Sequence, residues 1–332
     1  CNIWKIPREV PNLAISQWLD LLSSDLFADI RELDITGGEP FIRDDLIDLF
    51  LGICELKHKS LPALRSIAVT TNGFLTDAVV STVENILPTF QKKGLDLVVV
   101  CALDAVGALH NRIRNYPDAW PKVSNTLEEL ASLRNRHPNL IVGLKTTILP
   151  LNIAELCKIS DFAAAGGFFT IISPCIITKG RYLNPNRAKE LSFRPEEVDQ
   201  MIEFFSNEQL HWRFHTASLV DFYKTGTMKK PCSCGFNYFF VRSNGEIFLC
   251  PLIGESVGNI TTTGVSELFY SNKAGCIRKK IGKMPQCREC TEPGLERYSL
   301  PCEGLHYLRL LLKMRREDFF RLHEHMGLDK YL

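Results

Sequence analysis

The chain reads SIAVTTNGFLTDAVVSTVENILPTFQKKGLDLVVVCAL over residues 66–103, and this stretch decides the fold class. The stretch begins and ends with an apolar run of strand length, at residues 66–71 and 97–103. Residues 77–86 between them have the apolar spacing of an amphipathic helix. A strand, a helix and a second strand predict a βαβ unit, in which the strands are parallel and the helix covers the sheet.

The same alternation continues on both sides of this stretch. Apolar periodicity predicts helices over 15–30, 46–56, 119–134 and 153–165, and strands over 32–36, 140–147 and 168–173. Such a series favours an α/β fold, either a barrel or a doubly wound sheet, with helices covering a parallel sheet. In both arrangements ligands bind at the carboxyl ends of the strands.

The pattern changes after residue 215. Strands expected over 238–242 and 246–249 flank Asn244-Gly245, and Asn-Gly is the strongest hairpin-turn signal. Short helices and cysteine-bearing loops follow, and a long amphipathic helix is expected over 304–325. We therefore predict two domains, 1–215 and 216–332.

Composition bounds the class of protein. The 332 residues are 45% hydrophobic, enough for a large domain and a smaller one, and the formal net charge is only +1. This balance gives no reason to expect nucleic acid or an anionic membrane as a partner. The basic run Arg278-Lys279-Lys280 is typical of a solvated helix face. No apolar stretch reaches the length of a membrane span and no signal peptide is visible, so we expect a cytoplasmic protein.

The cysteines are numerous and clustered. Seven of the twelve lie between residues 232 and 302. In a small secreted domain this would indicate a disulfide framework, but in a large chain without a secretory signal such clustering indicates metal binding.

Polar and glycine-rich segments follow three successive predicted strands. These are Gly37-Gly38-Glu39-Pro40, Thr70-Thr71-Asn72-Gly73, and Cys101 to Asp104 with His110 to Arg114 beyond it. Glycines let a ligand approach the backbone closely, and Glu39 offers a carboxylate to a cationic group. We expect a ligand site at this edge of the sheet, although each segment alone would also serve as an ordinary turn.

GGEP, TTNG and LDAVGALHNRIR, in this order after successive strands, resemble the radical SAM superfamily. Cys1-Asn2-Ile3-Trp4-Lys5 resembles the end of the family's C-x3-C-x2-C loop. If Cys1 were the first cysteine of this loop, the second would stand at position 5, which is Lys5. Cys1 therefore matches the third cysteine, and the other two are expected upstream. The resemblance implies a partial (β/α)6 TIM-like barrel whose loop cysteines, Cys1 among them, hold a [4Fe–4S] cluster with one open iron.

The resemblance also implies roles for single residues. The open iron would bind S-adenosylmethionine (SAM), and Gly37, Gly38, Glu39 and Pro40 would hold its amino group. Asn72 and Asp104 would belong to the same SAM site. Many relatives have a serine facing the ribose where this chain reads CALD, so Cys101 is either a ribose contact or a buried small residue.

The C-terminal cysteines resemble a SPASM or shorter twitch domain. Cys234, Gly245 and Cys250 match its opening, and Cys287-x2-Cys290 supplies a later pair. The resemblance implies one auxiliary [4Fe–4S] cluster bound by Cys234, Cys250, Cys287 and Cys290, with Cys232 and Cys302 as further possible ligands. The sequence lacks the additional run of cysteines that would bind a second auxiliary cluster. Four cysteines with a CxxC pair are equally the signature of structural zinc, and the upstream motifs favour iron–sulfur.

The expected function is that of a radical SAM enzyme, an oxidoreductase or maturase. It would cleave SAM reductively to a 5′-deoxyadenosyl radical and abstract hydrogen from a peptide, a cofactor precursor or a small molecule. A one-electron donor such as flavodoxin or ferredoxin would be its partner. The alternative is a catalytically inactive relative whose C-terminal cysteines bind zinc as an interaction module.

Overall fold

The computed structural model describes residues 6–7, 9–178, 182–206, 213–229, 232–292 and 312. Contacts divide the chain into two compact units. We call Asn12–Thr147 with Ala154–Ile172 the sheet unit, and Cys1–Pro11, Ile148–Ile153 and Ser173–Leu332 the cysteine unit. This division falls near residue 173, whereas the domain boundary at 215/216 stays a prediction.

The sheet has five strands in the order in which they occur along the chain. They are β1 (Glu32–Ile35), β2 (Ser66–Thr71), β3 (Asp96–Ala102), β4 (Leu140–Ile148) and β5 (Phe169–Pro174). The pairs β1–β2, β2–β3 and β3–β4 are parallel, as the βαβ pattern predicts. Register pairs Thr71 with Cys101, and Cys101 with Leu144.

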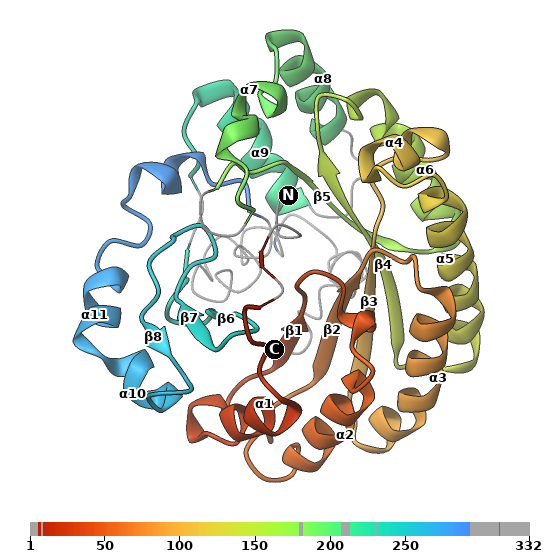
Figure 1. Cartoon of the computed structure of the whole chain (residues 1–332). Coiled ribbons are helices and arrows are strands. Elements are labelled where there is room, and N and C mark those ends of the chain that lie inside the picture. Colours follow the sequence, from red (N-terminus) through yellow and green to blue (C-terminus); the bar gives the residue numbers. More distant parts are fainter. Residues whose placement is uncertain are drawn as a thin grey trace. The chain divides into compact units, whose positions relative to one another are not determined.

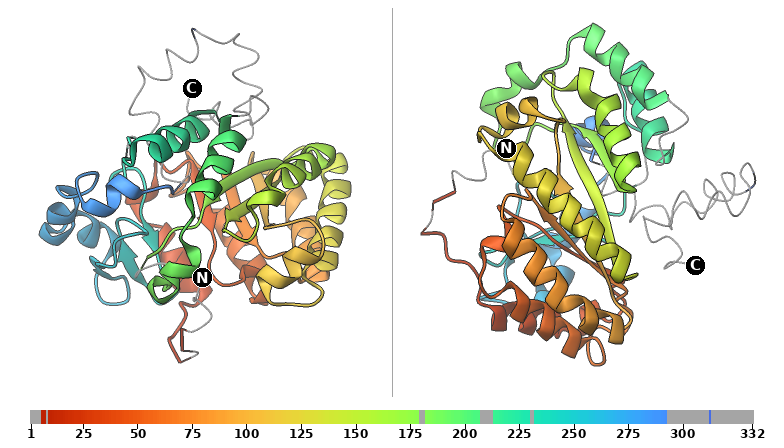
Figure 2. Two further views of the ribbon diagram at one scale, coloured as in Figure 1. Left: turned by 90° about the horizontal axis from the view of Figure 1, so that it is seen from above. Right: turned by 90° about the vertical axis from the view of Figure 1, so that its right-hand side faces the viewer.

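Helices follow the strands in alternation. They are α1 (Ile15–Leu22), α2 (Leu46–Leu56), α3 (Thr76–Lys92), α4 (Ala108–Arg114), α5 (Ala119–Arg136) and α6 (Leu156–Gly166). Figure 1 shows α2, α3 and α5 along one side of the strands, and Figure 2 shows the same layer from the side. Three short 3-10 helices, η2 (Asp25–Phe27), η3 (Pro40–Ile42) and η4 (Ile153–Glu155), complete the series.

The core lies between the sheet and this helical layer. Alternate strand residues such as Ile67, Val69 and Val99 are fully buried, because side chains of a strand point to opposite faces in turn. The helices contribute large apolar side chains, among them Phe50 and Phe90, whose rings make an edge contact at 5.8 Å. The other face carries a smaller apolar cluster of Ala68, Val98 and Val100 with Ile141 and Phe169.

The structure confirms the element types predicted for this part of the chain and changes some bounds. Residues 46–56 and 66–71 match the prediction at both ends. The helix predicted over 15–30 ends at Leu22, because the Ser24 side chain accepts from Leu26 N and starts a separate short turn. Helix α3 runs past the predicted end and through Pro88, since the fully buried Leu87 and Phe90 continue its apolar stripe.

The cysteine unit has shorter elements. Its helices are α7 (Ala188–Leu191), α8 (Pro195–Ser206), α9 (Arg213–Thr225), α10 (Val265–Tyr270) and α11 (Asn272–Arg278), with the 3-10 helices η5 (Pro185–Arg187) and η6 (Pro285–Glu289). The described part of this unit has a small sheet of β6 (Phe240–Val241), β7 (Glu246–Phe248) and β8 (Gly258–Asn259). β6 and β7 pair antiparallel around Asn244-Gly245, which confirms the predicted hairpin. The helix predicted over 304–325 lies outside the described residues.

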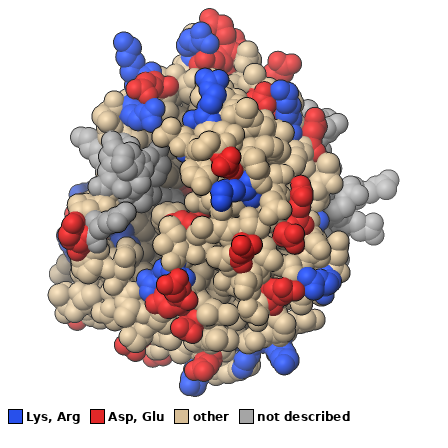
Figure 3. All heavy atoms as spheres, turned by 45° about the vertical axis from the view of Figure 1, so that its right-hand side comes forward, with Lys and Arg blue, Asp and Glu red and all other residues tan. Residues whose placement is uncertain are grey.

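Two surface properties bear on function. Within the described residues, no helix combines the length and the apolar character that crossing a membrane requires. Figure 3 shows basic and acidic side chains interspersed over the face that it draws, in keeping with a net charge of +1.

Candidate functional site

The loop after β1 offers an exposed backbone. Gly37 and Gly38 are both exposed, and a Cβ placed on either would meet no described atom within 4 Å. Gly37 has φ +156°, a conformation that side chains rarely adopt. The loop therefore leaves open space directly over its peptide groups, as the sequence predicts for a ligand-binding turn.

Glu39 joins the ends of β1 and β2. Its Oε1 accepts hydrogen bonds from Thr71 Oγ1 at 2.8 Å and from Phe41 N at 3.3 Å. Its Oε2 accepts from Asn72 N at 2.7 Å. A carboxylate has about four acceptor positions. Three are filled by described residues, and one position on Oε2 remains for a cationic group.

The loop after β2 is fixed by its own hydrogen bonds. Asn72 Oδ1 accepts from Phe74 N at 2.8 Å, and Thr71 Oγ1 accepts from Gly73 N at 3.0 Å. Gly73 has φ +72°, and its carbonyl accepts from the buried Thr126 hydroxyl at 2.7 Å. The Asn72 Nδ2 group has no acceptor among the described residues, so it is free to donate to a ligand.

Cys101 lies on the helical side of β3. Its side chain is fully buried, and burial raises the pKa of its thiol to about 12, with a further contribution from nearby Glu39. By strand alternation Ala102, rather than Cys101, shares a face with Val98 and Val100. Of the two alternatives that the sequence leaves open for Cys101, this position favours the buried small residue.

Asp104 is buried and engaged on several sides. Its Oδ2 pairs with Arg114 Nη2 at 2.9 Å, and its Oδ1 accepts from Thr147 N at 3.0 Å. Its backbone N donates to His110 Nδ1 at 3.2 Å. These contacts tie the end of β3 to α4 and β4, so Asp104 positions the loop that follows β3.

His110 belongs to this network, although its role was not foreseen from the sequence. Burial, and then the nearby Arg114, lower the pKa of its imidazole to about 4. The neutral ring accepts at Nδ1, and Nε2 has no partner among the described residues. Only its location in the HNRIR segment pointed toward the site.

The cysteine unit has thiols where a small domain normally has an apolar core. Cys234, Cys250 and Cys290 form one buried cluster, with Cys232 packed against it. Cys287 lies close enough to Cys232 and Cys250 for their charges to raise the pKa of its thiol. Five cysteines from three loops, separated by up to 58 positions in the sequence, thus gather in one region. None of the described cysteines forms a disulfide.

Hydrogen bonds aimed at sulfur distinguish these thiols. A hydrogen bond from Cys234, together with backbone groups of Leu252 and Ile253, lowers the pKa of the Cys250 thiol despite burial. Contacts with Cys232 and Cys250 raise the pKa of Cys234. Burial raises the pKa of Cys287, while backbone groups of Met284 and Gly282 oppose that rise. Hydrogen bonds to sulfur are what cluster-bound thiolates use to offset their burial.

Arg278 holds the loop of Cys234 in place. Its guanidinium donates to the carbonyls of Gly235 and Phe269, the second at 2.6 Å, and lies 4.2 Å from the Phe269 ring centroid. Gly235 needs its positive φ of 77°, and Ile281 and Leu249 pack closely over it. The predicted solvated basic run is therefore wrong for Arg278, whose burial lowers its pKa.

The donor set fits an iron–sulfur cluster. A [4Fe–4S] cubane takes four thiolates, each on its own iron. Such a cluster does not require three protein ligands around a single ion. Among the described residues, no three Cys, His, Asp or Glu side chains are placed in that way. Cys234, Cys250, Cys287 and Cys290 would supply the four sulfurs, and Cys232 lies beside Cys234 as a fifth thiol. The predicted ligands Cys1 and Cys302 lie outside the described residues.

Comparison with known families supports this reading of the cysteine unit. Residues 232–291 match the SPASM family model, described as an iron-sulfur cluster-binding domain. A search of curated proteins found no match. The match covers all five gathered cysteines and confirms the SPASM part of the predicted resemblance. Residues 232–291 are therefore similar to an iron–sulfur domain that is typical of radical SAM enzymes.

Proposed function

We propose that this protein is a radical SAM enzyme with an auxiliary iron–sulfur cluster. When bound, the first cluster would supply an electron that cleaves SAM to a 5′-deoxyadenosyl radical, which abstracts hydrogen from a substrate. The observation that carries the proposal is the SPASM match at 232–291 in a chain whose GGEP and TTNG segments adjoin through Glu39.

The residues at the strand ends would bind and orient SAM. The open backbone of Gly37 and Gly38 offers carbonyl groups to the amino group of SAM. The remaining acceptor position on Glu39 Oε2 suits the same ammonium, and Asn72 Nδ2 is available as a donor. Asp104 would act only by positioning its loop, and we leave the buried Cys101 out of the site.

The sheet would be the core of a partial (β/α)6 barrel. Its face with Ala68, Val98 and Val100 carries small and branched side chains, which leave room for a cofactor against the strands. Strand ends at one edge of such a sheet would surround the reacting atoms and exclude water from the radical.

The auxiliary cluster would be held by Cys234, Cys250, Cys287 and Cys290. Burial of three of these thiols and the hydrogen bonds to two of the four sulfurs support this set. Cys232 is only half-buried and adjoins Cys234, so it stays the alternative ligand. An electron donor such as flavodoxin or ferredoxin, a cytoplasmic location and a peptide, cofactor-precursor or small-molecule substrate complete the proposal.

The test uses the full-length protein, loaded with iron and sulfide without oxygen. SAM and a strong one-electron reductant are added, and 5′-deoxyadenosine is measured. We expect its formation, and we expect Cys1→Ala to abolish it while about four irons per chain remain on the auxiliary site.

Two results would overturn the proposal. One is a Cys1→Ala variant that cleaves SAM as the parent does, since Cys1 would then not hold the first cluster. The other is zinc in place of iron at residues 232–291 together with no 5′-deoxyadenosine, which would favour the inactive relative.

A further inference from the structure

The loop that bears Cys287 is surrounded by free positive charge. Between residues 271 and 290 the chain has six Lys or Arg and a single carboxylate, Glu289, although the whole chain carries only +1. Five of the cations are exposed, and four of these, Lys279, Lys280, Lys283 and Arg288, lie within ten positions of one another. Within the described residues none of these four side chains forms an ion pair. We call these four residues the basic surface.

The basic surface lies directly over the cysteines. Lys283 N donates to Lys280 O at 3.0 Å, so both lysines share one tight turn. Ile281, between them, packs inward against the cysteine cluster. Lys283 also stands between Gly282 and Met284, whose backbone groups hydrogen-bond the Cys287 thiol. The charges therefore stand one residue away from contacts to the half-buried Cys287.

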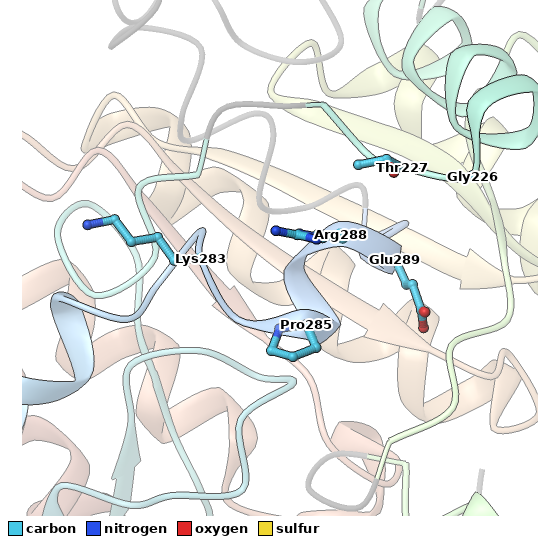
Figure 4. A pocket seen from close by; sticks show the side chains of 6 residues that line it. All are labelled: Gly226, Thr227, Lys283, Pro285, Arg288 and Glu289. Atoms are coloured by element: carbon cyan, nitrogen blue, oxygen red, sulfur yellow. The ribbon is translucent and has the colours of Figure 1, made fainter.

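A hollow lies beside these residues. It encloses about 460 Å³ and is lined by Lys283, Pro285, Arg288 and Glu289 with Gly226 and Thr227. Figure 4 shows the Arg288 side chain directed away from the Glu289 carboxylate, so this carboxylate does not neutralise it. The hollow thus presents positive charge beside the thiol loop.

An apolar anchor borders the same surface. Phe236, two residues after Cys234, is 60% exposed. Its ring centroid lies 5.8 Å from the Arg278 guanidinium, the residue before Lys279. Exposed aromatic rings beside cations are enriched at protein interfaces.

We propose that the basic surface and Phe236 are the docking site for a small acidic electron-carrier protein that exchanges electrons with the auxiliary cluster. This inference rests on the proposed function. One electron passes from the reduced carrier to the oxidised cluster, so the carrier is oxidised and the cluster reduced by the same electron. Complementary charge steers the encounter and brings the carrier's redox centre to the Cys287 edge.

Charge distribution favours a carrier protein over nucleic acid as the occupant. Nucleic acid is bound by long basic stripes, because affinity comes from many phosphate contacts. The basic surface has only four cations, all between residues 279 and 288, and the face drawn in Figure 3 mixes both signs. A short-lived encounter at a small charged patch is typical of redox partners.

The test measures binding of oxidised flavodoxin to the iron-loaded, full-length protein at low and at physiological salt. Charge reversal in the variant K279E/K280E/K283E should weaken binding about tenfold or more at low salt, and raised salt should weaken binding to the parent. The control K59E/K92E/K189E changes the net charge equally at exposed lysines elsewhere and should stay within about twofold. Iron content, expected to be unchanged, shows that the cluster domain has folded.

A second measurement follows reduction of the cluster by its absorbance. Reduced flavodoxin should reduce K279E/K280E/K283E more slowly than the parent, whereas dithionite, which needs no docking site, should reduce both equally. If the triple variant loses iron, the single variants K280E and K283E replace it, each with a smaller loss of affinity expected.

Three outcomes would overturn the docking site. They are equal binding by parent and triple variant, equal loss in the control, or binding of an RNA oligonucleotide through these lysines by a parent that does not bind flavodoxin. Formation of 5′-deoxyadenosine with dithionite tests the proposed function alone, so either idea can fail without the other.

Discussion

The sheet unit and the cysteine unit are stabilised in different ways. The sheet unit buries large side chains such as Phe50, Phe90 and Ile67 completely, between a parallel sheet and its helices. The residues 232–291 have three strands of two or three residues, and one of their buried clusters consists of Cys234, Cys250 and Cys290. Apolar burial stabilises the first. The second has replaced part of its apolar core by thiols, which gain most when they bind metal.

The candidate sites differ in the same way. At the strand ends, Glu39, Thr71 and Asp104 already have hydrogen-bond partners, so the proposed SAM site would be formed before any ligand binds. In the cysteine unit the thiols have hydrogen bonds with one another and with neighbouring backbone groups. Ligand-free geometry should therefore persist in the sheet unit and depend on the cluster in the cysteine unit.

The largest effect is expected from removing two cluster ligands. Cys234→Ala with Cys250→Ala should cost about four irons per chain, because a cubane does not survive the loss of half its ligands. Hydrogen exchange should then lose protection over β6 and β7, while β2 and β3 stay protected, since their stability comes from the sheet core. The control Cys276→Ala, at an exposed free cysteine, should keep its iron. Equal loss of protection in both units would contradict the conclusion that the two units are stabilised in different ways.

A steric change tests the sheet unit alone. Gly73→Ala would place a methyl group 2.8 Å from Val123 Cγ2 at a φ of +72°. We expect a cost of about 2–5 kcal/mol in the free energy of unfolding, from backbone strain and overpacking together. Gly94→Ala has a similar φ of +65° with no atom within 4 Å, and should show only the backbone cost of about 1–2 kcal/mol. Urea unfolding measures both, and similar costs would contradict the close packing of this loop.

Acidification should weaken the sheet unit through His110. Its pKa is about 4 in the folded protein and 6.5 in the unfolded chain, so between these values the unfolded state binds more protons. Stability is then lost as pH falls from about 6.5 to about 4, by up to about 3 kcal/mol. His110→Asn, which can still accept from Asp104 N, should flatten this dependence, and His58→Asn, at an exposed site, should not. An unaltered pH profile in His110→Asn would show that another group titrates.

The smallest effect is expected at the brace between the two strand ends. Thr71→Val removes the hydroxyl that donates to Glu39 and accepts from Gly73 N, and should cost about 1–2 kcal/mol. SAM affinity should fall as well, because Glu39 loses its fixed position. Thr71→Ser keeps the hydroxyl and should preserve SAM affinity. Loss of affinity in Thr71→Ser would mean that the methyl group, rather than the brace, matters.

The fold of the sheet unit was largely predictable because its signal is local. The strand 66–71 and helix 46–56 match at both ends, since backbone geometry imposes their apolar periods directly. The misplaced ends have tertiary causes. Burial of Leu87 and Phe90 carries α3 past Pro88, and a serine cap divides the segment predicted as one helix over 15–30.

The candidate sites were predictable as sets of residues, but their internal contacts were not. Motif order placed Glu39 and Asn72 at one edge of the sheet, yet the bond between them joins residues 33 positions apart. Cysteine spacing selected the thiols of residues 234–290 without deciding between Cys232 and Cys234. Arg278 shares a basic run with Lys279, and only packing against Phe269 distinguishes the half-buried Arg278 from the exposed Lys279.

By itself, the sequence determined the alternation of strands and helices, the strand ends that carry polar residues and the cysteines that gather. Each of these depends on periodicity or spacing within a few tens of residues. Tertiary structure alone decided that Glu39 keeps one acceptor position open, that Cys101 faces the helices and that Lys283 and Arg288 line one hollow. Such outcomes depend on which distant segments share the limited space of a close-packed interior, and packing of that kind has no local signature.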